Sequence, residues 1–527
     1  MKAASNNVLA ADFRRNPMAL LIVFVLFVFG AYLFAQYVVS DNIPGLAYIA
    51  LACLGATFLV GILNNWRNGL YFFLTWLLFE DFARKFLGNN MAIYFAKDVL
   101  IAFVYISFLM AYRRKTVQSF RPPFLVPVLL FVWFGVMQVF NPASNTLIYG
   151  VLGVKVYFCY VPLVFLGYAL INSESQLRKF FFVNLFFALI IGGLGIAQSI
   201  VGPTFLNPTH LAEDIREMST LYRTTLSGAT AYRANSVFVS AGRYADFILV
   251  SWLLVLGFTG YLLLRHRRGR ILAFITVATM YAAILLATSR GLFMWGTGSV
   301  LLIAAAFLWG APWKQREVAR VLRTLQRAAM AIALAMVVLF FVFPDALLSR
   351  LSIYSETLTP GGASSELQYR TWDYPVRNFL GAFTYDRWPY GFGIGTCSLG
   401  VQYVAHVMHE KPMNVGVESG FGTLVVEMGI GGLILWVVMS IAIVWCCWKV
   451  VLKLRGSPLF PIAFIVFWYA LMLLLPITFT SMAMYQDFVM NAYLWLMLGI
   501  LFRLPTLKLS PQFAVAAPQL SRGVQAR

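Results

Sequence analysis

The sequence contains few charged residues for its length. Asp, Glu, Lys and Arg together make up 11% of the 527 residues, and hydrophobic residues make up 61%. A soluble domain carries roughly 25% charged residues, and the mean hydropathy of this chain is +0.78. This composition excludes an ordinary soluble protein and indicates a chain that crosses a membrane many times.

Residues and motifs that bind metals or nucleotides are also scarce. We find no P-loop, no Rossmann fingerprint and no Asp-rich nucleotide-sugar motif on the face predicted to be cytoplasmic. The five cysteines show no metal-ligand spacing. Four of them lie in or at apolar runs (Cys53, Cys159, Cys446 and Cys447), and the fifth, Cys397, has no obvious partner outside the membrane. We therefore expect no bound metal, no cofactor and no disulfide framework.

Acidic residues are half as numerous as basic residues, and the formal net charge is +20. The basic residues do not gather into a patch that would bind nucleic acid. They occupy short connections between apolar runs, as the positive-inside rule describes. With the N-terminus inside, 26 of the 40 Lys and Arg residues but only 3 of the 20 acidic residues face that side. We predict a multi-pass membrane protein with both termini in the cytoplasm and no nucleic-acid partner.

Apolar windows of about 20 residues are long enough to cross a bilayer. Such windows lie at 18–40, 46–63, 70–87, 96–112, 124–140, 154–172, 180–201, 247–264, 271–288, 291–309, 328–347, 420–447, 459–480 and 487–503. The sequence thus predicts an all-α transmembrane bundle of about 14 spans, forming one integral membrane domain over residues 1–527. Two connections, 202–246 and 348–419, are long and periplasmic, and 504–527 is predicted to be a disordered cytoplasmic tail.

One polar stretch, residues 366–433, is punctuated by glycine. Gly391, Gly393 and Gly395 follow a Trp-Pro-Tyr turn rather than a predicted strand, so tight backbone packing explains them better than a dinucleotide site does. Glu418 precedes the next apolar helix and is a candidate general base, because partial desolvation raises a carboxylate pKa. The alternative is helix capping, in which Glu418 and Ser419 complement the helix dipole and the unpaired N–H groups at the helix start. Glu427 lies inside the helix and is predicted to be structural, paired with an arginine or a backbone N–H.

Several arginines lie on the side predicted to be periplasmic. Arg290 falls in a tight turn between two spans, where its charge must snorkel or find a partner. Arg233, Arg370 and Arg377 lie in the long connections, where a surface salt bridge is the ordinary role. Together such arginines would suit an anionic lipid head group, because guanidinium binds phosphate through two parallel hydrogen bonds. His409 is a further candidate for contact with substrate.

Four charged residues lie together near the end of a predicted span. Glu80, Asp81, Arg84 and Lys85 are predicted to form i,i+4 pairs on a helix that continues past the membrane surface. Apart from such helix ends, we expect the spans to hold no buried ion pairs. A transporter would instead place ionisable residues near the bilayer midplane and divide into two similar halves.

Four pieces of the chain, taken in order, resemble the bacterial O-antigen ligase and O-antigen polymerase superfamily, which includes exopolysaccharide polymerases. These are a segment that begins at Arg233, the turn Ser289-Arg290-Gly291, the long loop with Tyr369-Arg370-Thr-Trp372 and Gly-Phe-Gly-Ile-Gly, and Glu427-Met-Gly429 within a span. The resemblance covers about 200 residues, from Arg233 to Gly432; the first half of the chain matches only as generic spans.

The resemblance implies metal-independent glycosyl transfer at the periplasmic face. The donor is a glycan on undecaprenyl pyrophosphate, and Arg290 and Arg233 match the family's two arginines. Ligases carry His followed by Asn where this chain has Glu418-Ser419, so a polymerase of lipopolysaccharide or exopolysaccharide is favoured, with Glu418 as base. A chain-length regulator is a partner that such a polymerase can have. The alternatives are an O-antigen ligase and a polysaccharide or lipid transporter.

Overall fold

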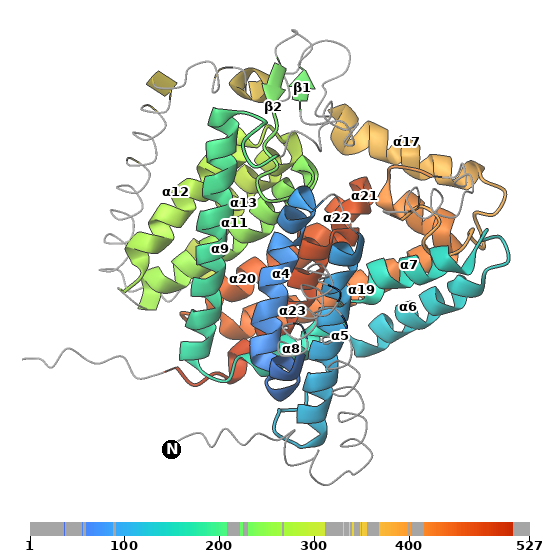
Figure 1. Cartoon of the computed structure of the whole chain (residues 1–527), viewed down its shortest axis with the longest axis horizontal. Helices are drawn as coiled ribbons and strands as arrows, with labels where there is room; N and C mark the ends of the chain where they lie inside the picture. Colours follow the sequence, from blue (N-terminus) through green and yellow to red (C-terminus); the bar gives the residue numbers. More distant parts are fainter. Residues whose placement is uncertain are drawn as a thin grey trace, which may run out of the picture.

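The structure is a computed structural model of the chain (Figure 1). It describes residues 59–87, 91–207, 222–224, 230–265, 268–310, 350–355, 368–398 and 416–509, together with a few single positions. Within these ranges the regular structure is helical, apart from one short antiparallel hairpin. The predicted all-α membrane class is confirmed.

The elements that bear on the site have the following bounds. They are α4 (Trp66–Phe86), α5 (Met91–Arg113), α6 (Leu125–Met137), η1 (Gln138–Phe140), α7 (Leu147–Phe158), α8 (Leu163–Leu170), α9 (Glu174–Val201), β1 (Tyr222–Thr224), β2 (Thr230–Tyr232), α11 (Ala241–Arg265), α12 (Arg270–Leu286), α13 (Arg290–Gly310), η3 (Tyr369–Asp373), α17 (Tyr374–Gly381), η4 (Ala382–Thr384), α19 (Gly420–Leu454), α20 (Phe460–Met472), η5 (Leu473–Ile477), α21 (Thr478–Thr480), α22 (Ala483–Gln486), α23 (Phe488–Arg503) and η6 (Leu504–Thr506).

Eight segments of the described chain are long and apolar enough to cross a membrane. They are Ile93–Arg113, Leu147–Leu170, Glu174–Val201, Ala241–Arg265, Arg290–Gly310, Gly420–Leu454, Phe460–Thr480 and Phe488–Thr506, and Leu125–Phe140 and Arg270–Leu286 are shorter apolar helices. The predicted spans 18–40, 46–63 and 328–347 lie almost wholly outside the described residues. A multi-pass membrane protein is therefore established, and the total of fourteen spans stays a prediction.

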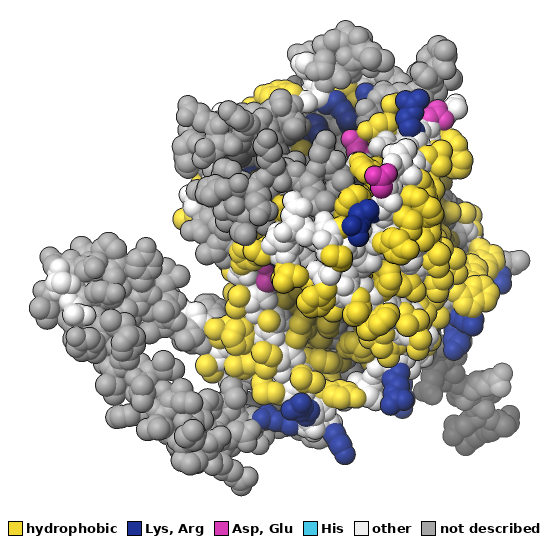
Figure 2. Space-filling view, turned by 90° about the vertical axis from the view of Figure 1, so that its right-hand side faces the viewer, with side chains coloured by type: hydrophobic (Ala, Val, Ile, Leu, Met, Phe, Trp, Pro, Cys, Tyr) yellow, Lys and Arg dark blue, Asp and Glu magenta, His cyan; other side chains and the backbone are white. Residues whose placement is uncertain are grey.

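Helix ends meet at two ends of the bundle, the lower and upper ends of Figure 1. At the lower end, Arg265 of α11 bonds Glu174 at the start of α9, with 2.5 Å between Nε and Oε1. At the upper end, Ser419 Oγ donates to the Phe479 carbonyl at 2.8 Å. Figure 2 shows Lys and Arg along the lower edge of an apolar surface. The exposed basic residues of the lower helix ends are Arg113, Arg114, Lys115, Arg121, Lys179, Arg268, Lys449, Lys453 and Arg455.

The centre of the bundle is formed by α11 and α23, which are apolar and almost entirely buried. A helix that is hydrophobic on all sides belongs inside a bundle. Helix α23 packs backbone to backbone on α8: a Cβ on Gly499 would strike the Val164 carbonyl oxygen, and a Cβ on Gly167 would strike that of Leu496. Small residues permit this close approach in membrane bundles.

The long connections hold more structure than predicted. In the first, 202–246, strands β1 and β2 pair with Tyr222 opposite Tyr232, and α11 already begins at Ala241. In the second, 348–419, the helices η3, α17 and η4 lie across the upper end of the bundle (Figure 1). The predicted tail also begins inside the fold, because Leu504 and Leu507 are buried.

Candidate functional site

The turn between α12 and α13 is the centre of an arginine-rich region at the upper end. Thr288 adopts a left-handed backbone conformation with φ 54°, and its Oγ1 donates to the Tyr232 carbonyl at 3.0 Å. Arg223 Nη1 donates to the Thr288 carbonyl at 3.5 Å. Arg290 is the first residue of α13 and is 8% exposed. Arg290 follows Thr288 by two residues, and Arg233 directly follows Tyr232. The hydrogen bond between Thr288 and Tyr232 therefore brings the backbones of the two arginines to the same turn.

A further arginine, Arg350, joins three elements at the same place. Its side chain is buried, and its Nε donates to the Leu286 carbonyl at 3.1 Å. Its Nη2 donates to the carbonyls of Tyr232 at 3.2 Å and Ser199 at 3.4 Å. Carbonyl oxygens hold a guanidinium in a fixed orientation but carry no net charge. Arg350 thus fixes the ends of α9 and α12 against the hairpin.

Tyr354 lies near three arginines of this region. Its hydroxyl donates to the Leu285 carbonyl at 3.0 Å, and its ring stacks on Phe293 of α13 at 4.3 Å between centroids. Burial raises the pKa of Tyr354 well above its ordinary value, and the nearby positive charges of three arginines oppose that rise: Arg350, Arg223 and Arg233. We call Arg223, Arg233, Arg290 and Arg350 the upper arginine cluster.

Sequence reasoning found only two members of this cluster. Arg233 and Arg290 were predicted as site residues, and the structure brings them to the same turn. Arg223 and Arg350 were not singled out. Arg350 follows the apolar window 328–347 by three residues, just as Arg290 follows the window 271–288 by two. An arginine at the outer edge of an apolar run was therefore a signal that applied to both.

The candidate base Glu418 lies beside α17 at the upper end. Its backbone N–H donates to Asn378 Oδ1 at 3.4 Å. Tyr374 also contacts it, and the hydrogen bond to the Glu418 carboxylate raises the pKa of Tyr374 above its ordinary value. Glu418 itself is exposed, so the partial desolvation expected for it is wrong.

Ser419, not Glu418, provides the side-chain cap of α19. Its hydroxyl oxygen accepts from the Gly422 N–H at 3.4 Å, in the arrangement that satisfies an unpaired donor at a helix start. The capping role considered for Glu418 is thus filled by its neighbour. The Glu418 side chain is left at the surface, next to Tyr374 and the polar face of α17.

The other predicted contact residues are less well placed. Arg377 is exposed on α17, the same helix that carries Tyr374 and Asn378. The backbone of Arg370 lies in η3, but its side chain is outside the described residues. His409 lies outside them entirely. The structure therefore places Arg377 on the helix beside which Glu418 lies, and the side chains of Arg370 and His409 are outside the described residues.

Glu427 is wholly buried and receives hydrogen bonds from the glycine-rich loop and from α7. Its Oε1 accepts from the Cys397 backbone N–H at 2.8 Å and from Ser398 Oγ at 3.0 Å. Its Oε2 accepts from the Tyr157 hydroxyl at 2.9 Å. A carboxylate at membrane depth is costly unless it is bonded in this way. Glu427 therefore secures the glycine-rich loop inside the bundle.

The glycines of that loop allow it to approach two helices. Gly391, Gly393 and Gly395 all have positive φ, and the Gly393 N–H donates to the Glu427 carbonyl at 2.9 Å. Helix α19 bends at Gly429, whose φ of 70° is not helical. A Cβ on Gly391 would lie 2.5 Å from the Glu427 carbonyl oxygen. The tight backbone packing predicted from the sequence is confirmed.

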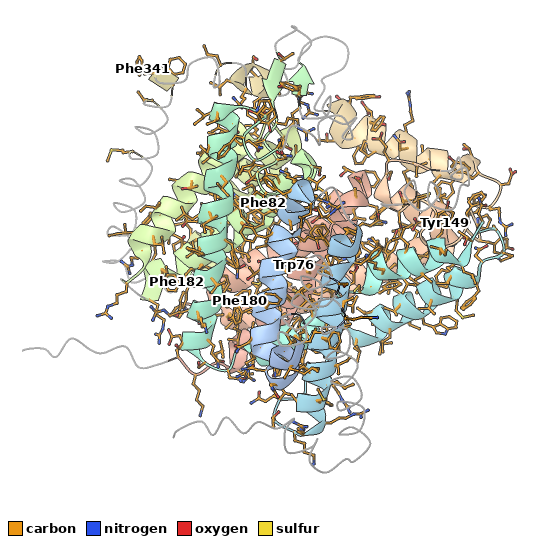
Figure 3. All side chains as sticks on the ribbon, in the orientation of Figure 1. Trp76, Phe82, Tyr149, Phe180, Phe182 and Phe341 are labelled. Atoms are coloured by element: carbon orange, nitrogen blue, oxygen red, sulfur yellow. The ribbon has the colours of Figure 1, made fainter. Side chains whose placement is uncertain are left out.

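A methyl group at Gly395 is expected to destabilise the fold. Gly395 has φ 90°, and an added Cβ would strike the carbonyl oxygen of Tyr149, which is labelled on α7 in Figure 3. We expect Gly395→Ala to reduce the free energy of unfolding by about 1–3 kcal/mol or more. Gly416→Ala is the matched control, because nothing lies within 4 Å of its added Cβ. Equal melting temperatures for the two purified variants would contradict this description of the loop.

Buried ion pairs, which we did not expect inside the spans, join the upper halves of α4, α5 and α11. Lys97 Nζ lies 2.7 Å from Glu80 Oε1, and both side chains are buried. Arg243 Nη1 lies 2.8 Å from Asp81 Oδ2, and Arg84 Nη1 lies 3.0 Å from Asp81 Oδ1. The partners differ from the predicted i,i+4 pairs: Glu80 and Asp81 pair with residues of other helices, Arg84 pairs with Asp81 at i,i+3, and Lys85 bonds the Ser236 carbonyl.

Three further hydrogen bonds extend this region, two of them toward Arg233 and one toward Glu427. Asp81 Oδ2 accepts from the Val239 N–H at 3.3 Å, and Lys85 Nζ donates to the Ser236 carbonyl at 2.6 Å. On the other side, Gln486 Nε2 donates to Ser398 Oγ at 3.2 Å. The region encloses a cavity of about 30 Å³, enough for about one water molecule, lined by Tyr94, Lys97, Lys155, Val156, Cys159, Tyr160, Arg243, Gln486, Asp487 and Phe488.

Comparison with known proteins adds no relative to this geometry. No family model matches the chain, and no curated protein is significantly similar to it. The function must therefore be argued from the upper arginine cluster, Glu418 and the buried ion pairs themselves.

Proposed function

We propose that the protein is a polysaccharide polymerase of the bacterial inner membrane. It transfers a glycan from undecaprenyl pyrophosphate onto a second lipid-linked repeat unit at the periplasmic face. The observation that carries this proposal is the upper arginine cluster: Arg223, Arg233 and Arg350 lie around Tyr354, and Arg290 is a buried residue of the adjoining turn. The exposed Lys and Arg residues of the lower end support a cytoplasmic lower face and a periplasmic cluster.

The chemistry follows from the charge that develops on the leaving group. The acceptor hydroxyl oxygen attacks the anomeric carbon of the donor, and the bond from that carbon to the pyrophosphate oxygen breaks. Arginines held by a rigid scaffold stabilise the negative charge that appears on the pyrophosphate. Glu418, exposed at the same end of the bundle, takes the proton of the acceptor hydroxyl. The pyrophosphate linkage is already activated, so no nucleotide is consumed.

A polymerase is preferred to an O-antigen ligase because of the residues at 418 and 419. The resemblance implies His followed by Asn at these positions in ligases, and this chain has Glu418 and Ser419 instead. Ser419 caps α19 through its hydroxyl, and Glu418 provides a carboxylate where ligases have an imidazole. A polymerase can also have a chain-length regulator as a partner.

Glu418→Gln tests the proposed base. The amide cannot accept a proton, so we expect the rate of elongation to fall about a hundredfold or more. Glu418→Asp keeps a carboxylate and is expected to retain more activity than the glutamine variant. The assay uses purified protein in nanodiscs with lipid-linked oligosaccharide from the host and a gel of the products. Wild-type rates in Glu418→Gln would remove this residue from the mechanism.

A transporter of polysaccharide or lipid is the second candidate, and the buried ion pairs favour it. Ionisable residues inside a membrane bundle commonly mark a substrate or proton path. In the upper half of the bundle, Lys97 and Arg243 line a cavity of about 30 Å³ and are paired with Glu80 and Asp81. That cavity is too small for a sugar, which is why we place glycosyl transfer first.

A further inference from the structure

The segment that contains α17 exposes large aromatic side chains at the upper end of the bundle. Trp372 is 64% exposed, Tyr390 73%, Tyr369 40% and Trp388 37%. Exposed apolar side chains that form a connected patch mark an interaction site, whereas single ones do not. We call these four residues the α17 aromatic surface.

Partly buried rings connect the two tryptophans of this surface. Trp372 lies 6.5 Å from Phe479 between ring centroids, and Phe479 lies 6.4 Å from Phe379. Phe379 is 5.3 Å from Phe383, which is 5.5 Å from Trp388. Each step is an aromatic contact within the range that stabilises ring pairs. The exposed rings are thus held on a continuous support rather than on a loose loop.

Residues 416–418, which precede α19, are hydrogen-bonded to Asn378 and Tyr385 and place Glu418 beside these rings. The Tyr385 hydroxyl bonds the backbone of Gly416 at 3.2 Å, and Asn378 accepts from the Glu418 N–H. Tyr374, which hydrogen-bonds Glu418, lies two residues from Trp372, and its ring is 5.5 Å from that of Tyr369. The α17 aromatic surface therefore borders the candidate base.

The charges on this segment distinguish a sugar from a membrane surface. The segment carries Arg370, Arg377 and Arg387 as well as Asp373, Asp386 and Glu418, so it has no excess of basic residues. The three acidic residues and Arg377 are exposed. Helices that lie in a bilayer interface combine aromatic residues with Lys and Arg, which attract anionic lipids. A pyranose ring instead has an apolar C–H face, which stacks on an aromatic ring, and hydroxyl groups at its edge, which bond carboxylates and amides. Exposed rings with carboxylates beside them fit a glycan better than a lipid head group.

We propose that the α17 aromatic surface binds the glycan chain of a substrate and leads its sugar residues past Glu418. This rests on the proposed function for the identity of the ligand as a glycan. Two tryptophans separated by a row of rings would hold several sugar residues rather than one. The surface would then set the position of the acceptor or donor glycan, separately from the pyrophosphate held by the upper arginine cluster.

Binding of a free oligosaccharide tests the surface without any need for transfer. The probe is the oligosaccharide released by mild acid from the host's own lipid-linked pool and labelled at its reducing end. Its fluorescence anisotropy is measured with the full chain in nanodiscs. We expect Trp372→Ala and Trp388→Ala each to weaken binding about tenfold, and Trp372→Phe to retain most of it. Trp133→Ala and Trp445→Ala are matched controls, because these tryptophans are 62% and 58% exposed on α6 and α19.

Each outcome decides the matter. Equal affinity in all variants, or no saturable binding by the wild type, overturns the proposal. Contact between the α17 aromatic surface and the bilayer also overturns the proposal. In nanodiscs of brominated lipid, such contact quenches tryptophan fluorescence, and Trp372→Phe removes the quenched component. Binding that depends on Trp372, without any glycan transfer, supports the surface and contradicts the proposed function. Glycan transfer with the same KM in Trp372→Ala as in the wild type supports the proposed function and contradicts the α17 aromatic surface.

Discussion

Arg290→Ala is expected to reduce glycan elongation by at least about a hundredfold, because one charge that stabilises the departing pyrophosphate is lost. Arg290 begins α13 beside the contact between Thr288 and Tyr232, where Arg233 also lies. Arg290→Lys keeps the charge but loses the planar guanidinium that bonds two phosphate oxygens at once. We therefore expect the lysine variant to recover only part of the rate.

The measurement is the rate of elongation in nanodiscs, with the melting temperature of each variant recorded beside it. Arg268→Ala is the matched control, since Arg268 is exposed at the opposite, lower end. We expect this control to elongate at the wild-type rate. If Arg290→Ala melts like the wild type and elongates at the wild-type rate, the upper arginine cluster is not the pyrophosphate site.

Lys97→Met is expected to destabilise the protein by about 3–5 kcal/mol, because it leaves the buried carboxylate of Glu80 without its partner. Lys97 Nζ lies 2.7 Å from Glu80 Oε1 and 3.4 Å from the centroid of the Tyr94 ring, in a region with almost no exposure. The double variant Glu80→Gln with Lys97→Met removes both charges. It is expected to recover much of the lost stability, since no uncompensated charge is left.

Thermal unfolding of the purified variants measures this effect. Lys179→Met serves as the control, because Lys179 is exposed at the lower end and its loss leaves no buried charge. A melting temperature for Lys97→Met equal to that of Lys179→Met would mean that the pair is not buried as described. Failure of the double variant to recover would show that Lys97 acts through contacts other than Glu80.

Hydropathy was sufficient to predict the helices but misplaced several of their ends, and the buried charges are the reason. The window 247–264 stops short of Arg243 and Asp246, yet α11 begins at Ala241 because Arg243 is paired with Asp81 of α4. The window 96–112 contains Lys97 and Asp98 in its first residues, and α5 begins still earlier, at Met91. Charged residues lower the local hydropathy even where another helix neutralises them.

The partners of these charges could not be predicted from one sequence. Glu80 and Lys97 are 17 residues apart, and Asp81 and Arg243 are 162 apart. Which pairs form depends on how the helices pack, and no local period encodes it. The same holds for Arg350, whose carbonyl partners lie on α9, α12 and β2. By contrast, the tight packing of the loop with Gly391, Gly393 and Gly395 could be predicted, because a glycine at every second residue indicates close backbone packing.

The most direct test of the proposed function uses the wild-type protein with its natural kind of substrate. Purified protein is reconstituted in vesicles with lipid-linked oligosaccharide from the host, and the products are separated on a gel over time. We predict a ladder of increasing repeat number, formed without nucleotide. Lipid-linked oligosaccharide that stays one repeat long, but moves from one leaflet to the other, would contradict the polymerase and identify a transporter.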